Sequence, residues 1–461
     1  MIRILLSLVI LSLIGCVSEK RTDDSRVFFA GEIVNPTTNT VILYKGDALI
    51  DSVSLDEQNR FVIALDSVEE GLHHFYHHPE LQYVFLEKGD SLQIRLNTVD
   101  FDESLVFSGQ GEEVNNFLLN LFLANEQEED LVYSYYDLAP PEFSDKVDSL
   151  QKMKVSALKE LDSEGQLTKE AFEIAKAGIM YSSFIYKEAY PFYHKKKKGE
   201  SAFHKLPGDF YTYRNFVDYN NEELTYLRPY YNFMKYHLGN LAYMSCQHGC
   251  DPEGMEESGQ LHFNKHKLSL IDSLVKQKDL RDNLFRNVAV DYLLKHDSEE
   301  YCESFIKSFH KRSGNNKHIA EITALYDGIQ NMRENRFLPE VTVYDAEGTA
   351  HSIRDVSRNK RVVFYFWSGA EKGHFTNISR RIAELKEKHP QYVYIGINLR
   401  TDKARWQNML ETYNLDKSEQ YWAEDYENVA RTLIVYDPNK SIIANNGIIV
   451  DAFANVYSSF K

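Results

Sequence analysis

The chain has 461 residues and a formal net charge of −17. At roughly 150 residues per domain, this length predicts about three domains, and 43% apolar with 26% charged residues is the composition of a folded protein. Because affinity for phosphate needs a concentrated basic surface, the acidic balance argues against a nucleic-acid partner. The basic run from His194 to Lys198 is short, and we expect it to form a solvated loop.

Residues 1–15 have the features of a secretory signal peptide. Arg3 precedes an apolar run, ILLSLVILSLIG, which is short for a helix that crosses a bilayer. The run ends in Leu13-Ile14-Gly15-Cys16, which resembles the lipobox of bacterial lipoproteins. The resemblance implies that Cys16 is lipidated and becomes the new N-terminus, so that acyl chains anchor the protein to a membrane. The alternative is a plain secretory peptide with an incidental cysteine.

The residues after Cys16 predict a flexible tether and indicate in which membrane the lipid anchor lies. Residues 16–26 are polar, and we expect them to form a flexible tether. Val17 is not the Asp that often retains lipoproteins at the inner membrane. We therefore expect a cell-envelope location at the outer membrane, facing the periplasm or the cell surface.

Three further cysteines are an odd number for an oxidising compartment. Cys302 is expected to be a buried thiol because it shares one predicted helical face with apolar residues. Those residues are Phe305, Ile306 and Phe309. Cys246 and Cys250 have a spacing that allows either a loop disulfide or two free thiols, and a metal site would need further ligands. We predict no metal and no cofactor.

Residues 27–111 are predicted to form a β-rich domain. The segment consists of short strands separated by turn signals such as Asn-Pro and Lys-Gly-Asp, which predicts a small sandwich or barrel. Gly31 and the segments SVSLDEQNRF, VFLEKGDSLQIRL and FSGQGEEVNNFLLN resemble the N-terminal β-domain found ahead of thioredoxin-like modules in Bacteroidetes-type lipoproteins. The resemblance implies a fold and no defined activity.

Four histidines in this domain fit a metal site poorly. On a strand, His73 and His77 lie on one face, whereas His74 and His78 lie on the other. The quartet is therefore split, and we expect surface histidines of a strand and hairpin rather than metal ligands.

Residues 112–335 have helical periodicity and predict a domain of six to nine helices. Aromatic residues are frequent, as in GDFYTYRNFVDYNNEELTYLRPYYNF, which is compatible with an aromatic binding groove. Packing in a core is the preferred interpretation. The absence of a clean repeat period argues against a solenoid.

Residues 336–461 predict a third, α/β domain. After a hairpin in FLPEVTVYDAEGTAHSIRD, a continuous apolar strand runs from Val362 to Trp367. A helix then ends before Pro390, YVYIGIN is a second buried strand, and a second helix covers residues 404–413. TLIVYD, a turn at PNKS and the following II are expected to form a closing β-hairpin. The order β, α, β, α, β, β with apolar strands suits a sheet covered on both faces.

This order and its motifs resemble the TlpA-like branch of the thioredoxin fold. The motifs are LPEVTVYDAEGTAHSIRD, RVVFYFW, YIGINLRTDKARWQNMLETYNL and TLIVYDPNKSII. In that family, a strand ending in aromatic-Trp leads to a Cys-x-x-Cys at a helix start. The resemblance places Glu371 and His374 at the two cysteine positions, and Ala430 at a later cis-proline position that faces the disulfide. The candidate groove beside them comprises Trp367, Arg431 and Thr432.

The missing thiols argue against redox chemistry. Thiol–disulfide exchange needs a thiolate at a helix N-terminus and a second thiol to resolve the mixed disulfide. A carboxylate at Glu371 suits the same helix end electrostatically but cannot perform that reaction. Glu371 and His374 are also spaced for an acid–base pair, although no nucleophile lies near them in the sequence.

The expected function follows from a sequence that has the motifs of the fold but lacks both cysteines of the redox site. We expect a lipid-anchored protein whose redox-inactive thioredoxin-like domain binds a protein, peptide or glycan. One alternative is a thiol-disulfide oxidoreductase of the TlpA-like family. The other is a structural or uptake-accessory component of the outer membrane.

Overall fold

The computed structural model describes residues 25–199, 206–245, 257–295 and 298–460. The predicted signal peptide, Cys16, and the pair Cys246 and Cys250 lie outside these residues. The chain divides into two compact units, Met1–Asn240 and Leu241–Lys461. It is a mixed α and β protein, as expected, while the division into three domains stays a prediction. Among the described residues, no helix combines the length and apolarity that crossing a membrane requires.

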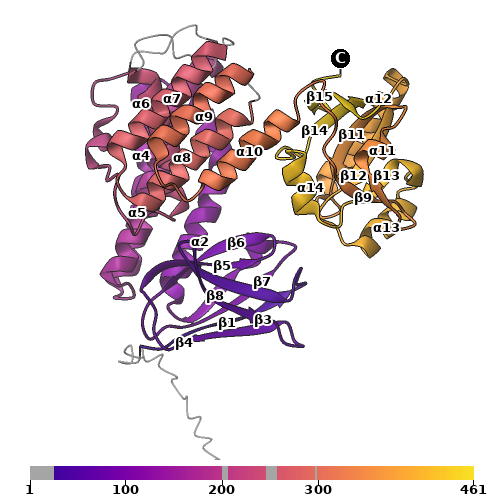
Figure 1. The fold of residues 1–461 in the computed structure, drawn as a ribbon. Helices are drawn as coiled ribbons and strands as arrows, with labels where there is room; N and C mark the ends of the chain where they lie inside the picture. The colour runs from indigo at the N-terminus through magenta and orange to yellow at the C-terminus, as the bar shows by residue number, and fades with distance from the viewer. Residues whose placement is uncertain (1–24, 200–205, 246–256, 296–297, 461) are drawn as a thin grey trace, which may run out of the picture. The chain divides into compact units, whose positions relative to one another are not determined.

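The first unit begins with two four-stranded sheets (Figure 1). Their orders are β4-β1-β7-β8 and β3-β2-β5-β6. Alternate residues point to opposite faces, so that Phe61 and Ile63 of β4 are buried while Val62 between them is 60% exposed. The inward residues of both sheets form one apolar cluster, which makes the pair a β-sandwich. The strands are β1 (Val27–Val34), β2 (Thr40–Lys45), β3 (Ala48–Ser54), β4 (Arg60–Leu65), β5 (Gly71–His77), β6 (Glu80–Leu86), β7 (Ser91–Asn97) and β8 (Val106–Gln110), with a short helix α1 (Phe101–Ser104) before β8.

Strand β5 corrects one expectation about the histidines. His73 and His77 are fully buried, because they share a face with Phe75, which lies in the sandwich core. Nδ1 of His73 donates to the carbonyl oxygen of Gly71 at 2.9 Å, and burial lowers the pKa of His73 to about 4. His74 on the opposite face is partly exposed. The split between faces is confirmed, but the expected surface position is wrong for the two inward histidines.

Five further α-helices of the described chain begin in the first unit. They are α2 (Glu112–Gln127), α3 (Glu129–Tyr135), α4 (Pro140–Ser163), α5 (Lys169–Lys198) and α6 (Arg228–Ser245), and a short 3₁₀ segment covers Thr212–Phe216. Helix α5 begins after Thr168, whose hydroxyl accepts from the amide of Ala171 at 3.1 Å. The basic run is the last turn of this helix rather than a loop, because lysines there complement the negative end of the helix dipole. His194 is buried and donates to the carbonyl oxygen of Tyr136 at 2.8 Å.

The described part of the second unit begins with four helices, α7 (Glu257–Leu274), α8 (Lys278–Leu293), α9 (Glu299–Ser313) and α10 (Ile319–Asn331). Helix α9 begins after Ser298, whose hydroxyl accepts from the amide of Tyr301. Its buried face consists of Cys302, Phe305, Ile306 and Phe309. The prediction of a buried free thiol at Cys302 is therefore confirmed.

A seven-stranded sheet with the order β10-β9-β13-β12-β11-β14-β15 forms the rest of the second unit. Strands β11, β12 and β13 are parallel, and β14 pairs antiparallel with β11. Six of the seven residues of β11 are buried, which explains its continuous apolar sequence. The elements are β9 (Thr342–Tyr344), β10 (Ala350–Ser352), α11 (Ile353–Val356), β11 (Arg361–Trp367), α12 (Lys372–Lys388), β12 (Val393–Asn398), α13 (Lys403–Thr412), β13 (Gln420–Trp422), α14 (Tyr426–Thr432), β14 (Lys440–Asn445) and β15 (Ile448–Asn455).

The closing hairpin lies further along the chain than predicted. It consists of β14 and β15, and the TLIV stretch instead ends helix α14 and starts a loop. The turn is Asn446-Gly447, whose φ values of 51° and 78° suit a tight hairpin turn. Strand β14 begins with two buried polar residues, Lys440 and Ser441. Because polar residues are typical of turns, the start of this strand was predicted as part of a turn.

Candidate functional site

The turn after β11 is held in a fixed conformation. The amide of Gly369 donates to Thr401 Oγ1 at 2.7 Å, and its carbonyl oxygen accepts from Arg405 Nη2 at 2.7 Å. A Cβ at Gly369 would lie 2.8 Å from side-chain atoms of both Thr401 and Met409. Glycine is therefore required, and the turn delivers Glu371 to the position directly before helix α12.

A cavity of about 110 Å³ opens beside this turn, at the ends of β11 and β12. We name it the turn cavity. The sequence-predicted residues Trp367, Glu371, His374 and Ala430 all line it. Arg431 and Thr432 follow on helix α14 but are not among the lining residues. The carboxyl ends of parallel strands are where open α/β sheets bind ligands.

Pro438 also lines the turn cavity and was missed from the sequence. It lies two residues before β14, the strand that pairs antiparallel with β11, whereas Ala430 lies within helix α14. Among the described residues the cis peptide bond is His78–Pro79, and the bond before Pro438 is not cis. The signal was a proline nine residues before Gly447 of the Asn-Gly turn, which the misplaced hairpin concealed.

Trp367 forms a rigid wall of the cavity. Its Nε1 donates to Gln420 Oε1 at 3.0 Å, and Nε2 of Gln420 donates to the hydroxyl of Tyr365 at 2.9 Å. The ring of Trp367 lies 4.9 Å from that of Phe375 on helix α12. Complete burial raises the pKa of Tyr365 to about 12, so this hydroxyl is neutral. The chain of hydrogen bonds fixes the orientation of the indole.

The turn cavity has polar groups but no cysteine among its lining residues. Nε2 of His374 is buried and has no hydrogen-bond partner among the described residues. Glu371 is exposed, and its side chain makes no capping bond to its own helix. Because that histidine nitrogen is unpaired, no hydrogen bond joins it to Glu371, and the arrangement lacks the contact of an acid–base pair. Residues 336–461 contain no cysteine.

Comparison with known proteins gives similarity over about a quarter of the chain. No protein-family model matches, and no curated protein matches. A proposed thiol-disulfide oxidoreductase from Bacteroides vulgatus is 20% identical, with 28% of this chain and 91% of that chain covered and a TM-score of 0.24. The C-terminal domain of a proposed thiol-disulfide oxidoreductase from Bacteroides thetaiotaomicron is 21% identical, with 26% and 86% covered and a TM-score of 0.23. A thiol-disulfide oxidoreductase from Bacteroides fragilis is 17% identical, with 25% and 88% covered and a TM-score of 0.21.

Proposed function

We propose that residues 336–461 form a redox-inactive thioredoxin-like domain of a cell-envelope lipoprotein, and that this domain binds a protein, peptide or glycan. The observation that carries the proposal is the turn cavity itself. Glu371 and His374 occupy its helix start, Pro438 lines the same cavity, and no thiol is present in residues 336–461. The fold is kept while the groups that the chemistry needs are absent.

The size of the turn cavity favours one side chain of a larger partner. At about 110 Å³ it is smaller than the 300–1,000 Å³ or so that small-molecule sites usually occupy. A peptide side chain that forms a hydrogen bond with Nε2 would satisfy the unpaired nitrogen of His374. A polypeptide is therefore the favoured partner among the three classes.

Two assays test the proposal. In the insulin-reduction assay with dithiothreitol, the purified chain should give the rate of the reaction without protein, and a thioredoxin-like rate would contradict redox inactivity. In a peptide-array experiment, His374→Leu should lose the peptides that the native chain retains. His310→Leu, at an exposed histidine of helix α9, is the matched control and should retain them.

The lipid anchor is a separate part of the proposal, because Cys16 lies outside the described residues. The supporting observation is the Leu-Ile-Gly-Cys sequence after the apolar run. Cys16→Ser should move the protein from the membrane fraction to the soluble fraction. Continued membrane association of this variant would contradict lipidation.

A further inference from the structure

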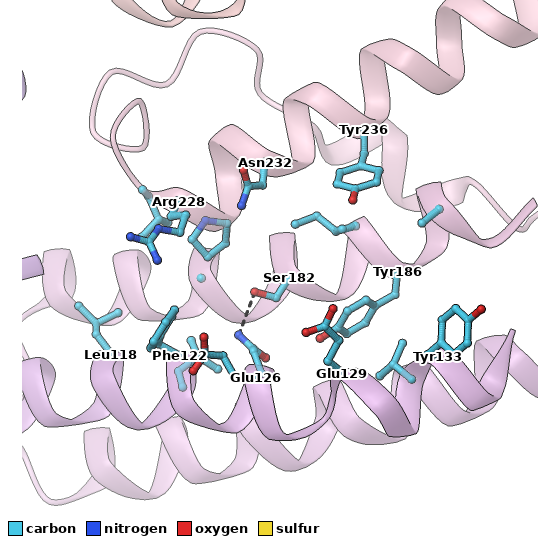
Figure 2. Close-up of a pocket in the computed structure, with 18 of the residues that line it drawn as sticks. Leu118, Phe122, Glu126, Glu129, Tyr133, Ser182, Tyr186, Arg228, Asn232 and Tyr236 are labelled. Carbon is cyan, nitrogen blue, oxygen red and sulfur yellow. Dashed lines mark hydrogen bonds between the residues drawn. The ribbon is translucent and has the colours of Figure 1, made fainter. Parts of the chain in front are cut away.

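A second cavity lies within the first unit, between helices α2 and α3 on one side and α5 and α6 on the other (Figure 2). Its volume is about 320 Å³, within the range of sites that hold small molecules. We name it the tyrosine cavity because six of its lining residues are tyrosines. Five of them are Tyr133, Tyr136, Tyr186, Tyr193 and Tyr236. A sixth, Tyr83, comes from strand β6 at the other end.

The tyrosines form a connected aromatic wall. The rings of Tyr136 and Tyr193 are stacked at 4.8 Å, and Tyr133 meets Tyr193 edge-on at 5.8 Å. Electron-rich ring faces of this kind attract cations. Tyr133 already has one, because Nζ of Lys197 lies 4.2 Å from its ring centroid.

Two exposed carboxylates give the cavity a negative charge that no ion pair neutralises in the described part of the chain. Figure 2 shows the carboxylate of Glu129 beside Tyr186 of helix α5 and the carboxylate of Glu126 beside Phe122. Within the described residues, neither carboxylate takes part in an ion pair or a hydrogen bond. The neighbouring Glu128, by contrast, is paired with Lys154 at 2.5 Å.

The negative charge of Glu129 contributes to the raised pKa values of two tyrosines at one end of the cavity. Burial raises the pKa of Tyr186 to about 12, and the charges of Glu128 and Glu129 add to this effect. Burial also raises the pKa of Tyr236, to which Tyr193 and Glu129 contribute. The tyrosine hydroxyls near Glu129 are therefore neutral, so they do not add negative charge of their own.

The cationic side chain of the cavity lies at the opposite end. Figure 2 shows Arg228 beside Phe122, and its guanidinium lies 5.5 Å from the centroid of that ring. The amide of Arg228 also donates a hydrogen bond to the hydroxyl of Tyr83. Arg228 forms no ion pair with Glu126 or Glu129 among the described residues. Lys197 at the aromatic end contacts the ring of Tyr133 but does not line the cavity, so no described cationic side chain lines that end.

We propose that the tyrosine cavity binds an organic cation, an ammonium group carried on an apolar or aromatic body, with the ammonium between Glu129 and the tyrosine rings. The apolar body would lie against Leu118, Leu121 and Phe122. The same chemistry is offered by a free amine and by a lysine side chain of a peptide. The proposal does not depend on the function of the turn cavity, which belongs to the other unit.

Isothermal titration calorimetry of the purified full chain with three matched compounds tests the charge preference. Phenethylamine should bind at least about tenfold more tightly than neutral 2-phenylethanol and anionic 3-phenylpropionate. Equal affinity for the amine and the alcohol would overturn the proposal, and so would no binding of the amine. Binding of a neutral sugar, methyl glucoside, in place of the amine would also overturn it.

Titration with Nα-acetyl-lysine-methylamide, which keeps the charged side chain, distinguishes a peptide lysine from a free amine. Affinity comparable to that of phenethylamine assigns the site to peptides, and weaker affinity assigns it to free amines.

Variants locate the binding. Glu129→Gln should weaken phenethylamine binding about tenfold, whereas Asp130→Asn, an exposed neighbour on the same helix that does not line the cavity, should leave it unchanged. Glu126→Gln provides a second variant should Glu129→Gln fail to fold. Tyr236→Ala should lose affinity and Tyr236→Phe should keep most of it, because the ring face is the proposed contact. Unchanged binding in all of these variants would place the cation elsewhere and overturn the proposal.

Discussion

Glu188 of helix α5 and His237 of helix α6 are joined by a 2.7 Å hydrogen bond from Nδ1 of the histidine, and both side chains are fully buried. The same carboxylate receives Arg214 through two bonds of 2.9 and 2.5 Å and Nδ2 of Asn240 at 2.7 Å. The hydroxyl of Tyr219 lies 2.7 Å from Nε2 of His237. One buried carboxylate therefore connects two helices and the segment between them.

Replacing this carboxylate should destabilise the first unit. Burial alone would raise the pKa of Glu188, but bonds from His237 and Arg214 outweigh burial and lower it. Glu188→Gln removes the charge and leaves Arg214 buried without its partner. We expect a loss of about 3 kcal/mol in the free energy of unfolding, measured by urea denaturation. Glu173→Gln on the same helix removes an exposed ion pair with Lys176 and should cost less than about 0.5 kcal/mol.

The same pair of variants gives a dependence on pH. Because the folded-state pKa of Glu188 lies below its unfolded value of 4.5, its stabilisation is complete above that value and is lost as pH falls through the folded pKa. The destabilisation by Glu188→Gln should therefore be full at pH 7 and shrink below about pH 4.5. A difference that stayed constant down to pH 3 would show that the charge does not contribute.

The sequence predicted the strands and helices whose apolar residues follow a regular local pattern. The apolar runs of β11 and β12 and the spacing of Phe375, Ile378 and Ile382 on helix α12 lie where expected, because burial of a strand or a helix face is a local property of the sequence. The closing hairpin was misplaced because Lys440 is buried, and a buried lysine resembles a turn residue. Its Asn446-Gly447 turn was the better signal.

The two cavities differ in how many of their lining residues can be predicted from the sequence. Glu371 and His374 were identified because they follow β11 directly, and a resemblance placed them at a helix start. The tyrosine cavity assembles residues from four helices, and its carboxylates are ordinary surface glutamates until Tyr186 and Tyr236 are brought to them. The aromatic stretch that drew attention in the sequence contributes only its end, around Arg228, to this cavity.

Restoring thiols tests the assignment of the redox positions. The double variant Glu371→Cys/His374→Cys places two cysteines at the start of helix α12, where the helix dipole lowers a thiol pKa. It should form a disulfide and accelerate insulin reduction by dithiothreitol, while each single variant should not. A double variant whose thiols both stay reactive to Ellman's reagent under oxidising conditions would show that the two positions do not form a redox pair.

Two glycines near the turn cavity should respond in opposite directions to alanine. A Cβ at Gly396 of β12 would collide with Oε1 of Gln420 and lie 2.8 Å from the Tyr365 ring, whereas nothing lies within 4 Å of one at Gly373. Gly396→Ala should therefore lower the free energy of unfolding by about 2 kcal/mol through overpacking. Gly373→Ala, in helix α12, should raise it by about 0.5 kcal/mol. Urea denaturation measures both, and equal effects would contradict the packing around Gln420.

Lys440 should make the stability of the second unit rise with pH. Its Nζ is buried, donates to the carbonyl oxygens of Leu433 and Ile434 at 2.6 and 2.9 Å, and lies 4.4 Å from the ring centroid of Phe453. Burial lowers its pKa from 10.5 to about 7.

Between these two values the unfolded chain binds more protons than the folded chain, so the free energy of unfolding increases with pH across that window. Lys440→Met removes this increase and leaves the two carbonyl oxygens without their donor. Urea denaturation at pH 6, 8 and 9.5 should therefore show a variant that is destabilised at every pH and falls further behind the native chain at each step. Parallel stability curves would show that Lys440 keeps its proton in the folded protein.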